Sequence, residues 1–248
     1  MRKFNVTCLL LVFILFLASC KKDKAPVTVP VVFDQTTYDT LGTFDNSGKP
    51  SDLLADTVSS GLKNFIDTML TEKTNLSTKY PELLSTSAIA DVKIIKPSDV
   101  YITFVAHGTK FANTFAFYTY TTGSSPTQTK DIKNITYVFP NAGAGTPLKK
   151  GDKIKIGRFE PGISIGFVLL QNSWNATTHA IDNKVVHFLS NDALNPEVDA
   201  SLKKHAVLIH YAAEDKTLIG FEDIYRTDAL CDHDFNDLLL YCTVKPAQ

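Results

Sequence analysis

Short segments in which apolar and polar residues alternate constrain the fold of this chain more than any other feature. Residues 99–106 read DVYITFVA and residues 113–121 read NTFAFYTYT. Alternation with a period of two is typical of β-strands that bury one face, and Gly, Pro, Asn and Asp between the segments favour turns. Comparable segments predict strands at residues 132–139, 153–156, 163–171, 184–189, 205–211, 218–222 and 237–244.

Nine short strands separated by turns predict a mainly β fold, an antiparallel β-sandwich of jelly-roll-like type, over residues 91–248. A parallel sheet would need a helix between successive strands, and the pattern after residue 91 contains no such helices. The chain has 248 residues, of which 44% are hydrophobic and 21% charged. A chain of this length and composition can bury a substantial core.

A helical pattern precedes the strands, in a predicted N-terminal helical region at residues 33–90. Between residues 52 and 73 the apolar residues recur at intervals of three and four, which predicts an amphipathic helix. Pro50 and Ser51 precede it as start signals, and Pro81 predicts the start of a second short helix. The first pattern consists of Leu54, Val58, Leu62, Phe65, Ile66, Met69 and Leu70.

The N-terminus has the pattern of a secretory signal. Arg2 and Lys3 precede an apolar stretch, and the following LASC, which ends at Cys20, resembles the bacterial lipobox. We therefore expect residues 1–19 to be a lipoprotein signal peptide and Cys20 to be lipidated, with residues 20–32 as a tether. The alternative is an ordinary cleaved signal with an incidental cysteine. The lipoprotein interpretation predicts an outer-membrane or cell-surface protein, anchored to the membrane by lipid.

The charges argue against nucleic acid as a partner. The formal net charge is −1, and Lys and Arg are scattered among acidic residues instead of forming a basic stripe with interleaved aromatics. An extracellular glycan or protein ligand is the expected partner besides the membrane. Trp174 is a candidate glycan contact, because an exposed aromatic ring beside Asn172 and Asn175 suits a sugar face. The alternative is a Trp174 buried over an edge of the sandwich.

The sequence predicts no enzyme activity. GISIG at residues 162–166 matches the G-x-S-x-G pattern of a nucleophilic serine, Ser164, but that turn must lead into a helix and the chain continues as a strand. A polysaccharide hydrolase would need two convergent carboxylates in a cleft. Glu160, Glu197 and Asp199 are the isolated candidates for such a pair. A purely structural envelope protein is a further alternative.

An acidic cluster near the C-terminus carries the site chemistry of the sequence. Like charges near 4 Å repel by about 4 kcal/mol at an effective dielectric constant of 20, so closely spaced carboxylates need a cation among them. Ca²⁺ fits best, because it binds six to eight oxygen ligands from acidic side chains, amides and carbonyls. The candidate ligands are Glu222, Asp223, Asp232, Asp234, Asn236 and Asp237.

The spacing of the cluster predicts how it folds. Asp232, Asp234 and Asn236 alternate along the chain, so a tight loop can turn all three toward one point while Phe235 faces the core. An EF-hand is excluded, because Asp237 stands where that loop needs Gly and Thr243 where it needs Glu. We expect two strand ends and a loop to wrap the ion. Because five carboxylates exceed the charge of one divalent ion, either two ions bind or some acids are paired with Arg226 or backbone amides.

Three alternatives for this region remain open. The acids can form a surface loop whose side chains cap its own turns. Zinc is a rival ion because Cys231 and His233 lie beside the cluster, although one Cys and one His among oxygen donors do not form the usual zinc tetrahedron. Cys231 and Cys242 can form a disulfide in an oxidising compartment, or remain as two buried free thiols.

The motifs also carry a family resemblance. GFED followed by DHDFNDLLLY resembles the C-terminal signature of the DUF4114 domain, and YITFVAHGTKFANTFAFYTYTTG, ITYVFPNAG and IGFVLLQNSW resemble its upstream blocks. The likeness covers residues 91–244 and, with LGTFDNSGKPSDLL and LNPE, extends to Bacteroidetes lipoproteins with a LruC-type domain. The resemblance implies a β-rich surface domain, often of adhesin-like or matrix proteins, that is suspected to bind calcium through the six candidate ligands named above.

Overall fold

The computed structural model describes residues 28–29 and 31–247. The predicted signal peptide 1–19, the lipidation site Cys20 and the first part of the tether lie outside the described residues. Of the predicted tether, Thr28 forms an antiparallel β-bridge with Glu197, and the amide of Val29 donates to the carbonyl of Pro196 at 2.7 Å. Phe33, the first residue after the predicted tether, is buried.

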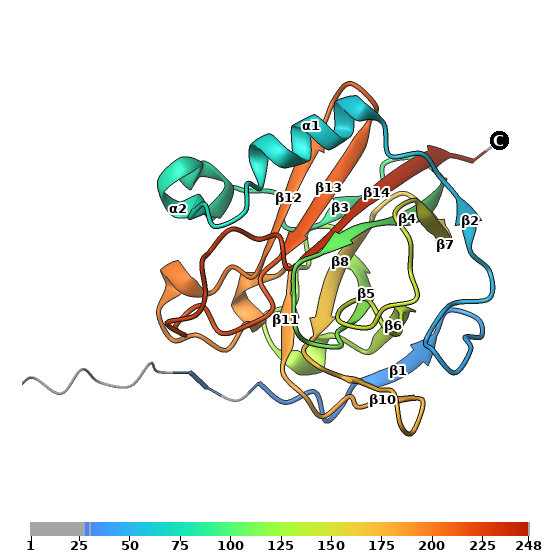
Figure 1. Ribbon diagram of the computed structural model, residues 1–248, viewed down its shortest axis with the longest axis horizontal. Coiled ribbons are helices and arrows are strands. Elements are labelled where there is room, and N and C mark those ends of the chain that lie inside the picture. The colour runs from blue at the N-terminus through green and yellow to red at the C-terminus, as the bar shows by residue number, and fades with distance from the viewer. Residues whose placement is uncertain (1–27, 30, 248) are drawn as a thin grey trace, which may run out of the picture.

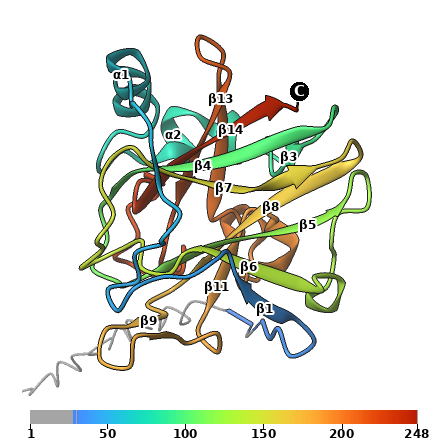
Figure 2. The ribbon, with the colours of Figure 1, turned by 90° about the vertical axis from the view of Figure 1, so that its right-hand side faces the viewer.

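Two β-sheets lie face to face (Figures 1 and 2). The first contains, in order, β1 (Thr37–Thr40), β6 (Asn134–Phe139), β5 (Thr114–Thr121), β8 (Ile163–Leu170) and β11 (His187–Leu189), and β3 (Val92–Lys93) also pairs with β8. The second contains β12 (Ala206–Tyr211), β13 (Lys216–Phe221), β14 (Leu238–Pro246), β4 (Ser98–His107), β7 (Asp152–Phe159) and β2 (Leu54–Ala55). Only the pair β1–β6 is parallel among these, and β9 (Trp174–Asn175) with β10 (Ala180–Ile181) forms a separate antiparallel ribbon.

The predicted mainly β fold and antiparallel sandwich are therefore confirmed. Each of the nine predicted strands is present, and most of their ends differ from the prediction by one to three residues. The strand predicted at residues 184–189 is shorter, because only 187–189 pair with β8. Alternation identified these strands because one face of each packs against the other sheet.

The helical region differs from its prediction. Helix α1 spans Ser60–Met69 and starts where the side chain of Ser59 accepts a hydrogen bond from the amide of Leu62. The expected start near residue 52 is wrong, because Leu54 and Ala55 form β2 against β7 and so give the region an edge strand. After α1 follow α2 (Leu76–Lys79) and a 3₁₀ turn at Pro81–Leu84, where the second helix was predicted.

Further 3₁₀ turns occupy Thr129–Asp131, Asp192–Leu194 and Ala200–Leu202. Among the described residues, no helix has the length and apolar character needed to cross a membrane.

Apolar side chains form three clusters. The largest fills the space between the sheets, with Phe104, Phe167 and Phe221 among its members. A second cluster lies between α1 and the outer face of β12, β13 and β14, where Leu62 and Ile66 are buried, and Figure 1 shows α1 crossing these strands. A third covers the outer face of the first sheet. Since α1 packs on the sheet that carries the acidic loop, the helical region helps to position that loop.

Candidate metal centre

The acidic residues meet because β13 and β14 are adjacent antiparallel strands. Phe221, the last residue of β13, pairs with Leu238, the first of β14. The residues that follow Phe221 and precede Leu238 therefore lie at the same end of the sheet, and the segment between them closes the loop. The amide of Asp223 donates to Oδ2 of Asp237 at 2.9 Å. The predicted meeting of two strand ends is thus present.

The carboxyl groups of Asp223 and Asp237 form the centre of this region. The backbone amide of Asp223 hydrogen-bonds to the Asp237 carboxyl, as described above, and Nδ2 of Asn113 donates to Oδ2 of Asp223 at 2.5 Å. Burial raises the pKa of both carboxyls, and the charge of Asp223 raises that of Asp237 further. Two ionised carboxylates repel each other strongly in such a buried place. Either one of them holds a proton, or a cation lies between them.

The connection between β4 and β5 supplies the other polar groups of this centre. Because His107 at the end of β4 pairs with Leu238, this connection lies beside Asp237. The amide of Gly108 donates to the carbonyl of Asp237 at 3.0 Å. Asn113, at the end of this connection, donates from Nδ2 to Asp223, and its Oδ1 accepts the amide of Asn172 at 2.8 Å. The sequence did not identify Asn113 as a site residue.

Glu222 closes the acidic loop from inside. Its side chain is 1% exposed. Oε1 accepts the amide of Phe235 at 2.8 Å, and Oε2 accepts the thiol of Cys231 at 3.0 Å. Burial raises the pKa of Glu222 to about 7. Both carboxylate oxygens of Glu222 thus have partners within the loop. One of these partners is a backbone amide, the kind of partner that the sequence suggested for some of the acids.

A second acidic group involves the loop that joins β13 to β14. One carboxylate oxygen from each of Glu72, Asp232 and Asp234 lies within 4.8 Å of the other two. Asp234 accepts the amide of Lys73 at 2.6 Å and both nitrogens of Asn236, and burial raises its pKa to about 6. Glu72 comes from the connection between α1 and α2, and no sequence pattern marked it.

Five of the six predicted ligands belong to two groups, and the sixth, Glu222, belongs to neither. Asp223 and Asp237 form the first, and Asp232, Asp234 and Asn236 form the second with Glu72, while Glu222 connects the loop to itself. Asp232, Asp234 and Asn236 do lie together, as their spacing predicted, because Asp232 and Asp234 share one group and Nδ2 of Asn236 donates to Asp234 at 2.9 Å. The described residues do not bring all six predicted ligands to one point. The two groups correspond to the sequence-based alternative of two ions more closely than to that of one.

The acidic loop is held by a tight backbone and a buried ring. His233 and Phe235 have φ values of 61° and 59°, in the left-handed region that non-glycine residues seldom occupy. Phe235 is fully buried in the cluster beneath α1, so the prediction that it faces the core is confirmed. The amide of Leu76 donates to the carbonyl of His233 at 2.9 Å, which ties α2 to the same turn.

Arg226 does not neutralise the acids directly. Its guanidinium donates to Nδ1 of His233 at 3.3 Å and to the carbonyls of Ser201 and Lys204, and it lies 5.2 Å from the centre of the Phe235 ring. Within the part of the chain that is described, no carboxylate forms an ion pair with it. Arg226 therefore supports the loop from beneath.

Cys231 and Cys242 are both free and buried. They form no disulfide, and the alternative of two buried free thiols holds. Cys242 lies in the core between the sheets, whereas Cys231 contacts Glu222 and lies 3.2 Å from Nδ1 of His233. Burial holds the pKa of the Cys231 thiol far above its ordinary value. The carboxylate and amide oxygens around Cys231 are the donors that calcium prefers, and one thiol and one imidazole among them do not form the usual zinc tetrahedron.

The other candidate residues have structural roles. Trp174 is 5% exposed and packs edge-on against Phe44, so its prediction as a sugar platform is wrong and the buried alternative holds. Ser164 is buried within β8 and hydrogen-bonds to Thr122 at 3.0 Å, instead of standing on a strand-to-helix turn.

The three isolated carboxylates are likewise accounted for. Glu197 is buried and accepts Nε2 of His205 at 2.8 Å and the amide of Arg226 at 2.9 Å. Asp199 caps the 3₁₀ turn at Ala200–Leu202, and Glu160 is exposed in the turn after β7.

The fold and the site together define the class of this protein: an antiparallel β-sandwich that buries a pair of carboxyl groups where two adjacent strands end. Residues 159–245 match the family described as "Domain of unknown function (DUF4114)". The matched range includes β8, β13 and all six predicted ligands. No curated protein and no solved structure matches the chain.

Proposed function

We propose that this chain is a lipid-anchored protein of the cell envelope whose β-sandwich is stabilised by calcium and acts as a binding or adhesion module. The observation that carries the calcium assignment is the buried contact between the carboxyls of Asp223 and Asp237 at the joined ends of β13 and β14. The lipobox at Cys20 and the likeness to LruC-type lipoproteins of Bacteroidetes support the anchor and the location.

The donor set favours a hard divalent cation over a proton. Carboxylate oxygens are ligands that calcium prefers, and those of Asp223 and Asp237 come from the adjoining ends of two paired strands. Asp223 and Asp237 would hold one ion. Glu72, Asp232 and Asp234 would hold a second, since each contributes an oxygen to one group.

Calcium bound in this way would connect three parts of the molecule. The first ion would join the ends of β13 and β14, and the second would join the acidic loop to the turn after α1 through Glu72. The amide of Lys73 already donates to Asp234 there. The rigidity of this end of the sandwich would then depend on extracellular calcium.

Calcium is therefore expected to raise the melting temperature of the purified protein. Saturation to one hundred times the dissociation constant stabilises a one-site protein by about 2.7 kcal/mol. For a domain of this size, that corresponds to a rise of roughly 5–11 °C. Differential scanning calorimetry with calcium, with magnesium and with chelator measures it, and isothermal titration gives the number of ions. Identical melting curves in calcium and chelator would refute the assignment.

The anchor is tested separately by replacing Cys20 with serine in a bacterial host that processes lipoproteins. The wild-type protein is expected to incorporate labelled fatty acid and to sediment with membranes. C20S is expected to lose the label and its membrane association, because the acyl chains attach to this thiol. Cys8→Ser, which alters another cysteine of the N-terminal segment, is the matched control and should leave both unchanged. Unaltered labelling of C20S would contradict the proposal.

A further inference from the structure

The described part of the tether is fixed to one end of the sandwich. Thr28 forms an antiparallel β-bridge with Glu197. The buried side chain of Glu197 accepts Nε2 of His205, which precedes β12, and the amide of Arg226, which lies in the connection after β13. The chain therefore enters the domain at the end of the second sheet where the acidic loop begins.

Four exposed aliphatic side chains surround this entry point, and we refer to them as the entry patch. Val29 and Val198 follow the two bridged residues, and each is 55% exposed. Val32, 62% exposed, precedes Phe33, whose ring stacks on the first residue of β11. Leu230 is 85% exposed in the connection after β13, which contacts the bridged segment. An exposed gathering of apolar side chains is typical of an interaction site for a protein or a membrane.

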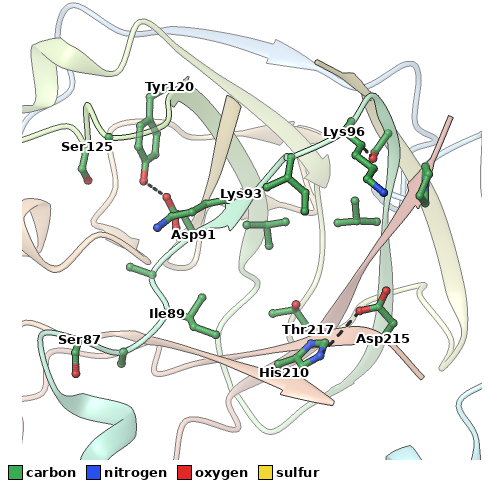
Figure 3. A pocket seen from close by; sticks show the side chains of 18 of the residues that line it. Ser87, Ile89, Asp91, Lys93, Lys96, Tyr120, Ser125, His210, Asp215 and Thr217 are labelled. Carbon is green, nitrogen blue, oxygen red and sulfur yellow. Dashed lines mark hydrogen bonds and ion pairs between the residues drawn. The ribbon is translucent and has the colours of Figure 1, made fainter. Parts of the chain in front are cut away.

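The other three exposed large aliphatic side chains of the described residues lie elsewhere. Leu54 belongs to the edge strand β2. Ile89 and Ile95 line a cavity of about 860 Å³ (Figure 3). Val244, near the end of β14, also lines this cavity, whereas the acidic loop precedes the start of that strand. The cavity and the entry patch are therefore at opposite ends of the second sheet.

The length of the tether limits how the domain can turn on a membrane. Eight residue steps separate the proposed lipid on Cys20 from Thr28. A fully extended chain covers at most about 3.6 Å per residue, so these steps reach at most about 29 Å. A domain of this length has a radius of gyration of about 17 Å and hence a diameter of roughly 45 Å. Because the tether is shorter than the domain is wide, the cavity end cannot turn to the membrane.

The charges beside the entry patch favour one kind of lipid surface. Asp199 and Asp228 are exposed next to Val198 and near Leu230, and each accepts a backbone amide of its own turn. These carboxylates disfavour an anionic lipid surface and are compatible with the ammonium groups of zwitterionic headgroups. The aliphatic side chains between them gain by leaving water.

We propose that the entry patch rests on the lipid surface of the membrane, among zwitterionic headgroups. The acidic loop then faces the membrane, and the cavity between β3 and the β12–β13 hairpin faces outward. The inference rests on the proposed lipid anchor at Cys20. It adds to that anchor a contact surface and an orientation of the domain.

The test reconstitutes the full lipidated chain with Leu230→Trp into phosphatidylcholine vesicles in calcium. Brominated phosphatidylcholine is expected to lower the fluorescence of the new Trp about twofold or more, since apolar groups at a membrane surface bury roughly 5–10 Å into the boundary of headgroups and acyl chains. The wild type supplies the background, because its single Trp174 is buried. Ile95→Trp is the matched control: Ile95 is 81% exposed at the opposite end, so its signal should be the same in both lipids.

A charge within the entry patch should weaken the contact. Val198→Asp, added to L230W, is expected to remove at least about half of the quenching, because burying a carboxylate without a partner is costly. Leu54→Asp introduces the same charge at an exposed aliphatic residue of β2 and should leave the quenching unchanged.

Sedimentation of the vesicles separates the two proposals. Protein that does not sediment with them refutes the lipid anchor and this inference together. Protein that sediments, but whose L230W signal is quenched no more than that of I95W or is unaffected by V198D, refutes the inference alone and leaves the entry patch for a protein partner.

Discussion

Phe235→Ala is expected to lower the free energy of unfolding by about 3–5 kcal/mol, the usual cost of truncating a buried Phe. The Phe235 ring is fully buried beneath α1, among Leu62, Ile66 and Leu239. Its removal leaves a cavity there and also uncovers the guanidinium of Arg226. Urea unfolding followed by circular dichroism, in the presence of chelator, measures the effect on the protein alone.

The same substitution should weaken calcium binding. The Phe235 amide donates to Glu222, and Asp234 and Asn236 lie on either side of it. Without the ring the loop loses the contact that fixes its left-handed turn. Leu230→Ala is the matched control, because Leu230 lies in the same loop and is 85% exposed. It should change the free energy of unfolding by less than about 0.5 kcal/mol. If F235A were as mild as L230A, the loop would not depend on this anchor.

Phe235 illustrates what the sequence can predict about this molecule. Its position between Asp234 and Asn236 was sufficient to assign its direction, because polar residues on both sides leave the intervening ring to the core. The strands were predictable for the same local reason, since one face of each packs against the opposite sheet. Even β8, which is buried on both faces, was marked by its apolar run IGFVLL.

The missed residues depend on contacts between distant segments. Glu72 joins Asp232 and Asp234 only because α1 packs across β12–β14, and local sequence carries no record of that packing. Asn113 lies just before β5 in the first sheet and reaches Asp223, which follows β13 in the second, only because the two sheets face each other. Trp174 was misjudged because neighbouring polar residues suggested exposure, whereas its ring packs against Phe44 from a loop far away in the chain.

Asp237→Asn is expected to reverse the sign of its effect according to whether calcium is present. In calcium it removes a ligand charge, so the calcium-induced rise in melting temperature should be largely lost. In chelator the wild type must take up a proton at this pair on folding, because burial and the charge of Asp223 raise the pKa of Asp237 to about 9. The asparagine is already neutral, and its side-chain oxygen can still accept the hydrogen bond from the Asp223 amide. The variant should then be more stable than the wild type by about 1–4 kcal/mol at neutral pH.

The pH dependence without calcium follows from the same burial. Folding raises the pKa of Glu222 from 4.5 to about 7 and that of Asp234 from 3.8 to about 6. A group whose pKa is higher in the folded state contributes stability below its unfolded pKa and loses that contribution as pH rises through the folded value. In chelator, stability contributed by these groups should therefore fall between about pH 4 and pH 7. The Asp223–Asp237 pair acts in the same direction at higher pH.

Calcium should oppose this loss, because it binds the ionised carboxylates and so replaces the protons that the folded protein otherwise holds. The difference in melting temperature between calcium and chelator should consequently grow as pH rises from 5 toward 8. D237N should show a smaller difference at every pH, whereas Asp34→Asn, at an exposed acid far from the site, should behave like the wild type. A difference that is independent of pH, or that D237N leaves unchanged, would mean that calcium acts elsewhere than at the joined ends of β13 and β14.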